Sequence, residues 1–215
     1  MNTSKLRSDL IDCLSKELIS EGFKFSKARE AFIRKTDFGQ QWYTITFLKY
    51  SGQEGFEVNP GYHVRFEDVE GFFHETSYFS EKDKKGTSTI GCSIENHLAN
   101  GKDAFRQSIE TDEDVATACA YYYDLYLKVV APFFDKYRTL ESLDELMNSD
   151  PEKELSLINF IFRGAKGAII AHMLGGDRLS DLIKTYGEQY AKFSNGFYKG
   201  DYDKVVENIQ KVTAT

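Results

Sequence analysis

The spacing of apolar residues changes twice along this 215-residue chain, and these changes restrict its fold more than any single motif. Leucines recur every four residues from Leu6 to Leu18, which predicts an amphipathic helix that ends near Gly22. Residues 23–94 then alternate or carry β-branched and aromatic runs between turn residues, which predicts three to five antiparallel strands. Helical spacing returns at Thr111. The order predicts an α+β fold: an N-terminal helix, an antiparallel β-sheet meander, then C-terminal helices packing on the sheet.

The C-terminal half carries clear helix-start signals. Thr111 with Asp114 three residues later predicts a capping box for a helix that would run to Pro132. Asp150 as N-cap and Pro151 at the first helical position predict the start of a long apolar helix. Further helices are expected at 140–147, 178–193 and 201–213.

These patterns predict an α+β domain over residues 1–147 and a helical extension over 148–215, packed on the first. The most apolar window, residues 155–174, is long enough to consider as a membrane span. Arg163 and Lys166 inside it would each cost about 2.5–3.5 kcal/mol near the centre of a bilayer. We therefore interpret it as a buried helix and expect no membrane contact.

Charge and cysteine content restrict the partners and the compartment. The net charge of −7 comes from 34 acidic and 27 basic residues dispersed along the chain, so no basic stripe is left to bind nucleic acid. The three cysteines, Cys13, Cys92 and Cys119, are far apart and form no CxxC pair, which argues against a zinc site or a disulfide framework. We expect a reduced, cytoplasmic protein, because the N-terminus also lacks a signal-like apolar run.

The segment GYHVRFEDVEGFFHE, residues 61–75, is the densest group of candidate polar side chains. On a strand, His63, Arg65 and Glu67 would share one face, but the backbones of His63 and Glu67 would lie about 13 Å apart with a cation between them. A metal site is therefore not predicted, and a solvated face with a cross-strand Arg–Glu pair is favoured. As an alternative, these three residues, with Arg34 if its strand is adjacent, could hold an anionic ligand.

Catalytic signatures are missing from the sequence. There is no G-x-S-x-G motif, and Cys92 fits a small core residue better than a nucleophile. The segment FRGAKGA lacks the order of a phosphate loop, so Gly164 and Gly167 are expected to let another element approach closely. We expect no cofactor and leave enzyme activity uncertain, with a non-enzyme favoured.

Aromatic residues offer a different kind of candidate. Tyr121 and Tyr123 belong to a tyrosine run that covers most of a helix circumference. Core packing explains the inward members of this run. Tyr121 and Tyr123 are candidates for an aromatic partner-binding surface.

Three segments, LRSDLIDCLSKELISEGFKFSKAREAFIRK, WYTITFLKYSGQEGFEVNPGYHV and APFFDKYRTLESLDELM, carry a family resemblance over residues 4–147. In this order they resemble the bacterial domain-of-unknown-function family 4304. The matching positions are Gly22, Phe23, Phe32, Arg34, Val58, Asn59, Gly61 and 132–134. The resemblance implies a leading helix, a small sheet and a late helix that runs into a Pro-aromatic segment. It supplies no activity and no catalytic residues.

Three functions remain open from the sequence. The favoured one is a non-catalytic protein-binding module, immunity-like or regulatory, by analogy with small acidic bacterial α+β proteins that accompany toxins. The second is a small-molecule-binding protein or enzyme that uses the polar sheet face. The third is a homo-oligomeric structural protein, and the sequence does not specify an oligomeric state.

Overall fold

The structure is a computed structural model that describes residues 3–213. Contacts between residues divide the chain into two compact units. Unit 1 comprises Met1–Val64 and Ile90–Lys136, and unit 2 comprises Arg65–Thr89 and Tyr137–Thr215. The two units interleave along the chain, whereas the sequence suggested one boundary near residue 147. The predicted domain boundary stays a prediction.

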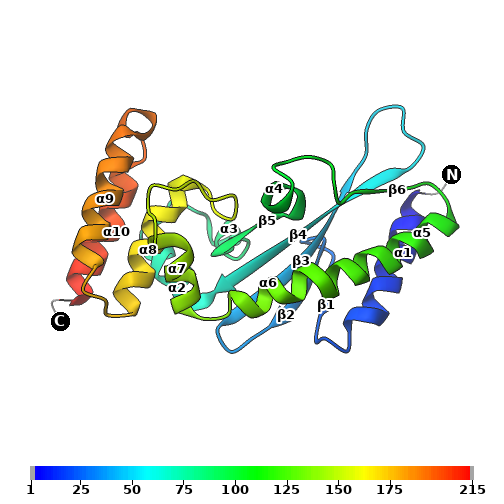
Figure 1. The fold of residues 1–215 in the computed structure, drawn as a ribbon, viewed down its shortest axis with the longest axis horizontal. Helices are drawn as coiled ribbons and strands as arrows, with labels where there is room; N and C mark the ends of the chain where they lie inside the picture. Colours follow the sequence, from blue (N-terminus) through cyan, green and yellow to red (C-terminus); the bar gives the residue numbers. More distant parts are fainter. Residues whose placement is uncertain (1–2, 214–215) are drawn as a thin grey trace. The chain divides into compact units, whose positions relative to one another are not determined.

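Unit 1 joins helices to an antiparallel sheet, which confirms the predicted α+β class (Figure 1). Its elements are α1 (Thr3–Leu18), β1 (Lys24–Ser26), β2 (Ala31–Lys35), β3 (Gly39–Leu48), β4 (Phe56–Phe66), β5 (Ile90–Ser93), α4 (Ile94–Leu98), β6 (Gln107–Ile109), α5 (Asp112–Leu125), the π-helical turn η1 (Tyr126–Val130) and α6 (Ala131–Lys136). The last two residues of β4 belong to unit 2. The leucine-spaced first helix is confirmed, and its four leucines are buried.

The sheet has strand order β1-β2-β3-β4-β5, and β6 pairs with β4 beside this path. The sequence predicted three to five strands and missed β6, which is only three residues long. β2 and β4 are separated by β3, so Arg34 on β2 and His63 on β4 do not lie on adjacent strands. The condition under which Arg34 would join His63, Arg65 and Glu67 is therefore not met.

Helix α5 packs along α1, and buried tyrosine hydroxyl groups fix it to the sheet. The Tyr122 hydroxyl donates to the Val58 carbonyl at 2.9 Å, and the Tyr43 hydroxyl donates to the Tyr122 carbonyl at 3.0 Å. The capping box predicted at Thr111 is present. The helical path continues past Pro132, contrary to prediction, because η1 shifts the hydrogen-bond ladder just before the proline, whose ring cannot donate.

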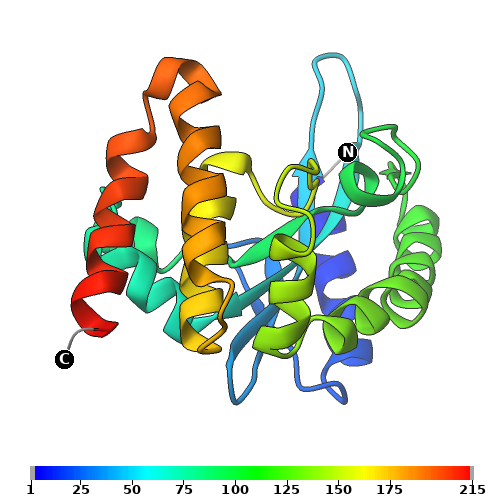
Figure 2. The ribbon, with the colours of Figure 1, turned by 60° about the vertical axis from the view of Figure 1, so that its left-hand side comes forward.

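Unit 2 is helical and is organised around one central helix, α8 (Figure 2). Its elements are α2 (Glu67–Thr76), α3 (Glu81–Lys84), α7 (Leu140–Asn148), α8 (Phe160–Met173), α9 (Leu179–Lys192), the 3-10 turn η2 (Phe193–Gly196) and α10 (Lys199–Thr213). Helices α2, α7, α9 and α10 all contact α8. The α9 and α10 helices lie side by side in both ribbon views, and the turn that joins them is at one end.

Two predictions about unit 2 are corrected. The apolar helix begins at Phe160 with Asn159 as its N-cap, because the segment after Pro151 forms turns instead. The segment read as the end of a strand forms α2, whose first turn carries three acidic residues that favour a helix N-terminus. The expected close approach at the α8 glycines is present: a Cβ at Gly164 would lie 2.6 Å from the ring of Tyr190.

Candidate functional site

His63 is half-buried in unit 1 and Arg65 is buried, so the face around them is not the solvated strand face that the sequence predicted. Its ring lies 5.9 Å from that of Trp42, and a Cβ at Gly91 on the neighbouring strand would come 2.3 Å from His63 Nδ1. Burial lowers the pKa of His63 to about 4. The imidazole is therefore neutral at physiological pH and packs against Trp42.

Arg65 is buried, with 7% of its surface exposed. Its Nε donates to Glu67 at 2.9 Å, and its Nη1 donates to the carbonyls of Lys84 and Thr87 at 3.0 and 2.7 Å. The Arg–Glu pair that the sequence suggested exists, but it joins residues two apart on one chain segment and not residues across two strands. The guanidinium ties the end of β4 to the loop before β5.

Arg34 has a comparable structural role in unit 1. Its Nε and Nη2 both donate to Gln41 Oε1, at 3.0 and 2.7 Å, and its Nη1 donates to the Glu21 carbonyl at 3.1 Å. The guanidinium also lies 4.8 Å from the centre of the Phe23 ring. Arg34 and His63 lie in unit 1, while Arg65 and Glu67 lie in unit 2, and their role as a ligand site stays a prediction.

An ionic network that the sequence analysis missed lies in the interior of unit 2. It consists of Arg65, Glu70, His74, Thr87, Thr89 and Lys166. Glu70 is 0% exposed, and its Oε1 lies 2.6 Å from the Nζ of Lys166. The hydroxyls of Thr87 and Thr89 donate to its two carboxylate oxygens at 2.6 and 3.0 Å. The sequence signal for this network was Lys166, because a lysine in the apolar segment of α8 needs a buried acidic partner.

The electrostatics of the ionic network favour a fixed charge pair. Burial raises the pKa of Glu70, but the charge and hydrogen bond of Lys166 and the Thr87 hydroxyl outweigh it, so the net pKa lies below its ordinary value. Burial lowers the pKa of Lys166, and Glu70 opposes that shift. Burial also lowers the pKa of His74. The Lys166 ammonium donates in addition to the Ser88 carbonyl at 2.7 Å, so internal partners surround the pair.

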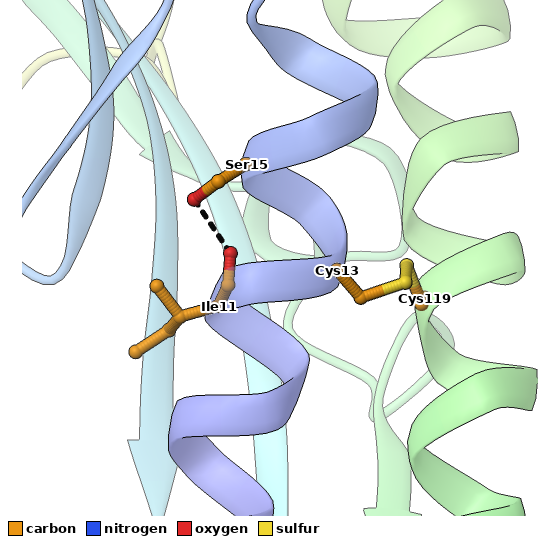
Figure 3. The surroundings of a disulfide bond; sticks show 4 residues. All are labelled: Ile11, Cys13, Ser15 and Cys119. Carbon is orange, nitrogen blue, oxygen red and sulfur yellow. Dashed lines mark hydrogen bonds between the residues drawn. A yellow bond between two sulfur atoms is a disulfide. The ribbon is translucent and has the colours of Figure 1, made fainter.

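The three cysteines behave differently from the sequence expectation. Cys13 on α1 and Cys119 on α5 form a disulfide, with a sequence separation of 106 and 6.2 Å between their Cα atoms (Figure 3). The prediction of no disulfide is therefore wrong. Cys92 is half-buried, and burial raises the pKa of its thiol to about 12, which leaves almost no thiolate to act as a nucleophile.

The two tyrosines predicted to bind a partner are half-buried on α5. Tyr121 packs edge-on against Tyr122, with 5.2 Å between ring centres, and Tyr123 stacks on Tyr126 at 6.3 Å. Part of each ring thus contributes to the packing of unit 1. Their role in partner binding stays a prediction.

An aromatic recess in unit 2 carries candidate binding groups. Six aromatic residues from α2, the loop after it, α8, α9 and the start of α10 line it: Phe73, Tyr78, Phe162, Tyr190, Tyr198 and Tyr202. Its space is about 410 Å³, part of which is open to solvent. Thr76 and Asp201 add a hydroxyl and a carboxylate to the lining. Sequence reasoning missed this site because its residues come from four separate segments.

Exposed aromatic side chains lie at or next to the aromatic recess. Tyr78 lines it, and the rings of Phe193 and Phe197 lie 6.0 and 4.9 Å from the ring of the lining residue Tyr198, centre to centre. The aromatic rim comprises Tyr78, Phe193 and Phe197, which are 66%, 40% and 78% exposed. Phe193 and Phe197 flank the α9–α10 turn, where Ser194 and Asn195 have φ of 47° and 54°, a conformation that non-glycine residues rarely adopt. A sharp left-handed turn therefore holds two large apolar rings at the surface.

Two structural searches of the described chain are negative. Within residues 3–213, no three His, Cys, Asp or Glu side chains lie close enough to hold a metal ion. Over the same residues, no helix has the length and apolarity needed to cross a bilayer.

Comparison with known proteins gives no relative from which a role could be transferred. No protein-family model matches the chain, and neither the curated proteins nor the solved structures contain a match. The resemblance to family 4304 thus stays a prediction.

Proposed function

We propose that this protein is a non-catalytic protein-binding module and that the aromatic rim of unit 2 is its contact surface. The observation that carries the proposal is the exposure of three aromatic side chains: Tyr78, which lines the aromatic recess, and Phe193 and Phe197, which pack beside the lining residue Tyr198. Large aromatic side chains are enriched in protein interfaces, and clustered exposed apolar groups mark interaction sites.

The internal contacts of the polar residues predicted to bind a ligand support a binding role over a catalytic one. Arg34 and Arg65 donate to internal acceptors, and the half-buried His63 packs against Trp42. Each of these side chains has a structural function, whereas the rim residue Phe197 stays largely exposed to solvent. An immunity-like or regulatory protein of this kind needs a recognition surface and no reaction centre.

The apolar stretch that suggested a homo-oligomer is used inside unit 2. Residues 155–174 are apolar and contain α8. Helices α2, α7, α9 and α10 contact α8, and most of its residues are buried. Sizing by light scattering remains the measurement that decides the oligomeric state.

Affinity capture with matched variants tests the proposed function. The tagged protein is incubated with lysate of its own host in three forms: wild type, the double variant Tyr78→Ser/Phe197→Ser, and Leu98→Ser. Leu98 is 52% exposed in unit 1 and serves as the control for loss of a surface apolar group. The proposal expects a stoichiometric partner with wild type and the control but not with the double variant. Equal capture by all three forms, or no partner at all, would contradict it.

The proposed cytoplasmic location has a consequence for Cys13 and Cys119. Disulfides are rare in reducing compartments, so in cells we expect these residues to be thiols that oxidise after isolation. Alkylation of intact cells before lysis, followed by mass spectrometry, measures the thiol fraction directly. A pair that is fully oxidised in living cells would place the protein in an oxidising compartment instead.

A further inference from the structure

We propose that the aromatic recess binds an alkylammonium group, such as a quaternary ammonium head group or a methylated lysine side chain. This inference shares its surface with the proposed function, but its test uses only the purified protein and a small cation. The argument rests on the rings that form the walls, on the charge of the lining and on one unpartnered hydroxyl.

Internal contacts fix two of the rings that line the aromatic recess. The rings of Tyr190 and Tyr202 stack with 4.5 Å between their centres. The Tyr190 hydroxyl donates to the Ile161 carbonyl at 2.8 Å, and the Tyr202 hydroxyl donates to the Ile183 carbonyl at 3.1 Å. Because these bonds hold both rings in place without a ligand, little conformational entropy is lost when a ligand binds.

The rings of this unit already interact with a cation. The Lys166 ammonium lies 5.2 Å from the centre of the Phe73 ring and 5.8 Å from that of Phe162, and both rings also line the aromatic recess. Such distances allow attraction between a cation and the ring face. Lys166 itself is paired with Glu70, so the wall behind these rings carries no uncompensated positive charge.

The polar groups of the aromatic recess suit a cation. Asp201 carries the one carboxylate among the lining residues that the structure describes, and its partner Lys204 is a surface lysine 2.8 Å away. The Thr76 hydroxyl oxygen is buried and has no hydrogen-bond partner. A buried hydroxyl without a partner is costly, and its lone pairs can accept from an ammonium N–H or a polarised N-methyl C–H.

The aromatic recess is small and partly open. Its space of about 410 Å³ includes open solvent, and only about 30 Å³ is available to the centre of a water-sized group, so a ligand group would be held against the walls and not fully enclosed. Aromatic walls with a nearby carboxylate are the surroundings in which proteins recognise quaternary ammonium groups. An anion would meet the Asp201 carboxylate, so the lining disfavours anionic ligands.

Calorimetric titration with choline and with 3,3-dimethyl-1-butanol tests the inference, because the second compound has the same shape without the charge. Cation–π attraction predicts saturable choline binding that is about three- to thirty-fold tighter than binding of the neutral alcohol. A recess that is only hydrophobic would bind the alcohol equally well or better. That result, or the absence of saturable choline binding, would overturn the inference.

Two matched variants locate the site. Asp201→Asn removes the lining carboxylate and should weaken choline binding several-fold while leaving binding of the neutral alcohol unchanged. Asp203→Asn removes a carboxylate on the same helix that pairs with Lys199 outside the recess, and it should leave both affinities unchanged. Equal weakening by the two variants would mean that general surface charge, and not this recess, attracts the cation.

A further titration distinguishes the two sources of the ligand. A short peptide with one trimethyllysine is compared with choline under the same conditions. Tighter peptide binding identifies a partner's side chain as the ligand, and tighter choline binding identifies a small molecule. If wild type captures a partner through the aromatic rim but does not bind choline, this inference fails and the proposed function stands.

Discussion

The ionic network and the aromatic recess lie in the same unit and share neighbours, but their side chains are used in opposite ways. Around Glu70 and Lys166, carboxylate, ammonium and hydroxyl groups satisfy one another out of contact with solvent. In the aromatic recess, large rings line a space that is partly open to solvent, and the Thr76 hydroxyl has no hydrogen-bond partner. The difference teaches that, in this protein, charged clusters stabilise the fold and aromatic clusters are the candidates for binding.

The largest expected effect comes from breaking the ionic network. Lys166→Met leaves the Glu70 carboxylate buried without its main partner, and we expect unfolding free energy to fall by about 3–5 kcal/mol. Urea denaturation measures the change. The exposed pair of Lys128 and Asp124 provides the control, because Lys128→Met should cost less than about 1 kcal/mol.

The double variant Glu70→Gln/Lys166→Met sharpens this result. It removes both charges, so it should recover part of the stability that Lys166→Met loses. A Lys166→Met loss no larger than that of Lys128→Met would show that the network does not stabilise unit 2, and the contrast with the aromatic recess would fail.

His63 is the corresponding case in unit 1. Its lowered pKa predicts that the stability of the protein depends on pH. Its pKa is about 4 in the folded state and 6.5 in the unfolded state, so the unfolded chain binds more protons between these values. Stability should therefore be complete above pH 6.5 and decline as pH falls toward 4, by on the order of 3 kcal/mol from this group. Denaturation of wild type and of His63→Phe across that range measures this loss of stability. If the free energy of unfolding changed with pH equally in both forms, the imidazole would not be held neutral in the folded state.

The smallest expected effect on stability belongs to the aromatic rim. Phe197 is 78% exposed, so Phe197→Ser should change the free energy of unfolding by no more than about 0.5 kcal/mol. Phe134, which is fully buried, is the contrast, because Phe134→Ala should cost about 3–5 kcal/mol. A loss above about 2 kcal/mol at Phe197 would mean that this ring belongs to the core and is not held out for a partner.

Local signals made much of the fold predictable. The leucine spacing of the first helix and the capping box at Thr111 each depend on residues close in sequence, and both are present. Helix α2 was missed because its segment follows a strand without a break and has a glycine at its centre. Propensity is a weak guide there, and packing on α8 decides the structure.

The candidate site depends on contacts that sequence patterns do not encode. The aromatic recess combines residues as distant as Phe73 and Tyr202, and the disulfide joins Cys13 to Cys119. His63 and Arg65 looked like surface groups because polar residues alternate with apolar ones on one strand. Arg65 is buried and His63 is half-buried, so the alternation does not indicate a fully exposed face.

Photo-crosslinking at position 197 in living host cells tests the central claim most directly. A photoreactive phenylalanine analogue replaces Phe197 in one form and Leu98 in another, and products are identified by mass after illumination. We expect a discrete adduct with one partner protein from position 197 and none from position 98. No adduct at 197, or the same adduct from both positions, would contradict the claim that the aromatic rim of unit 2 is the binding surface.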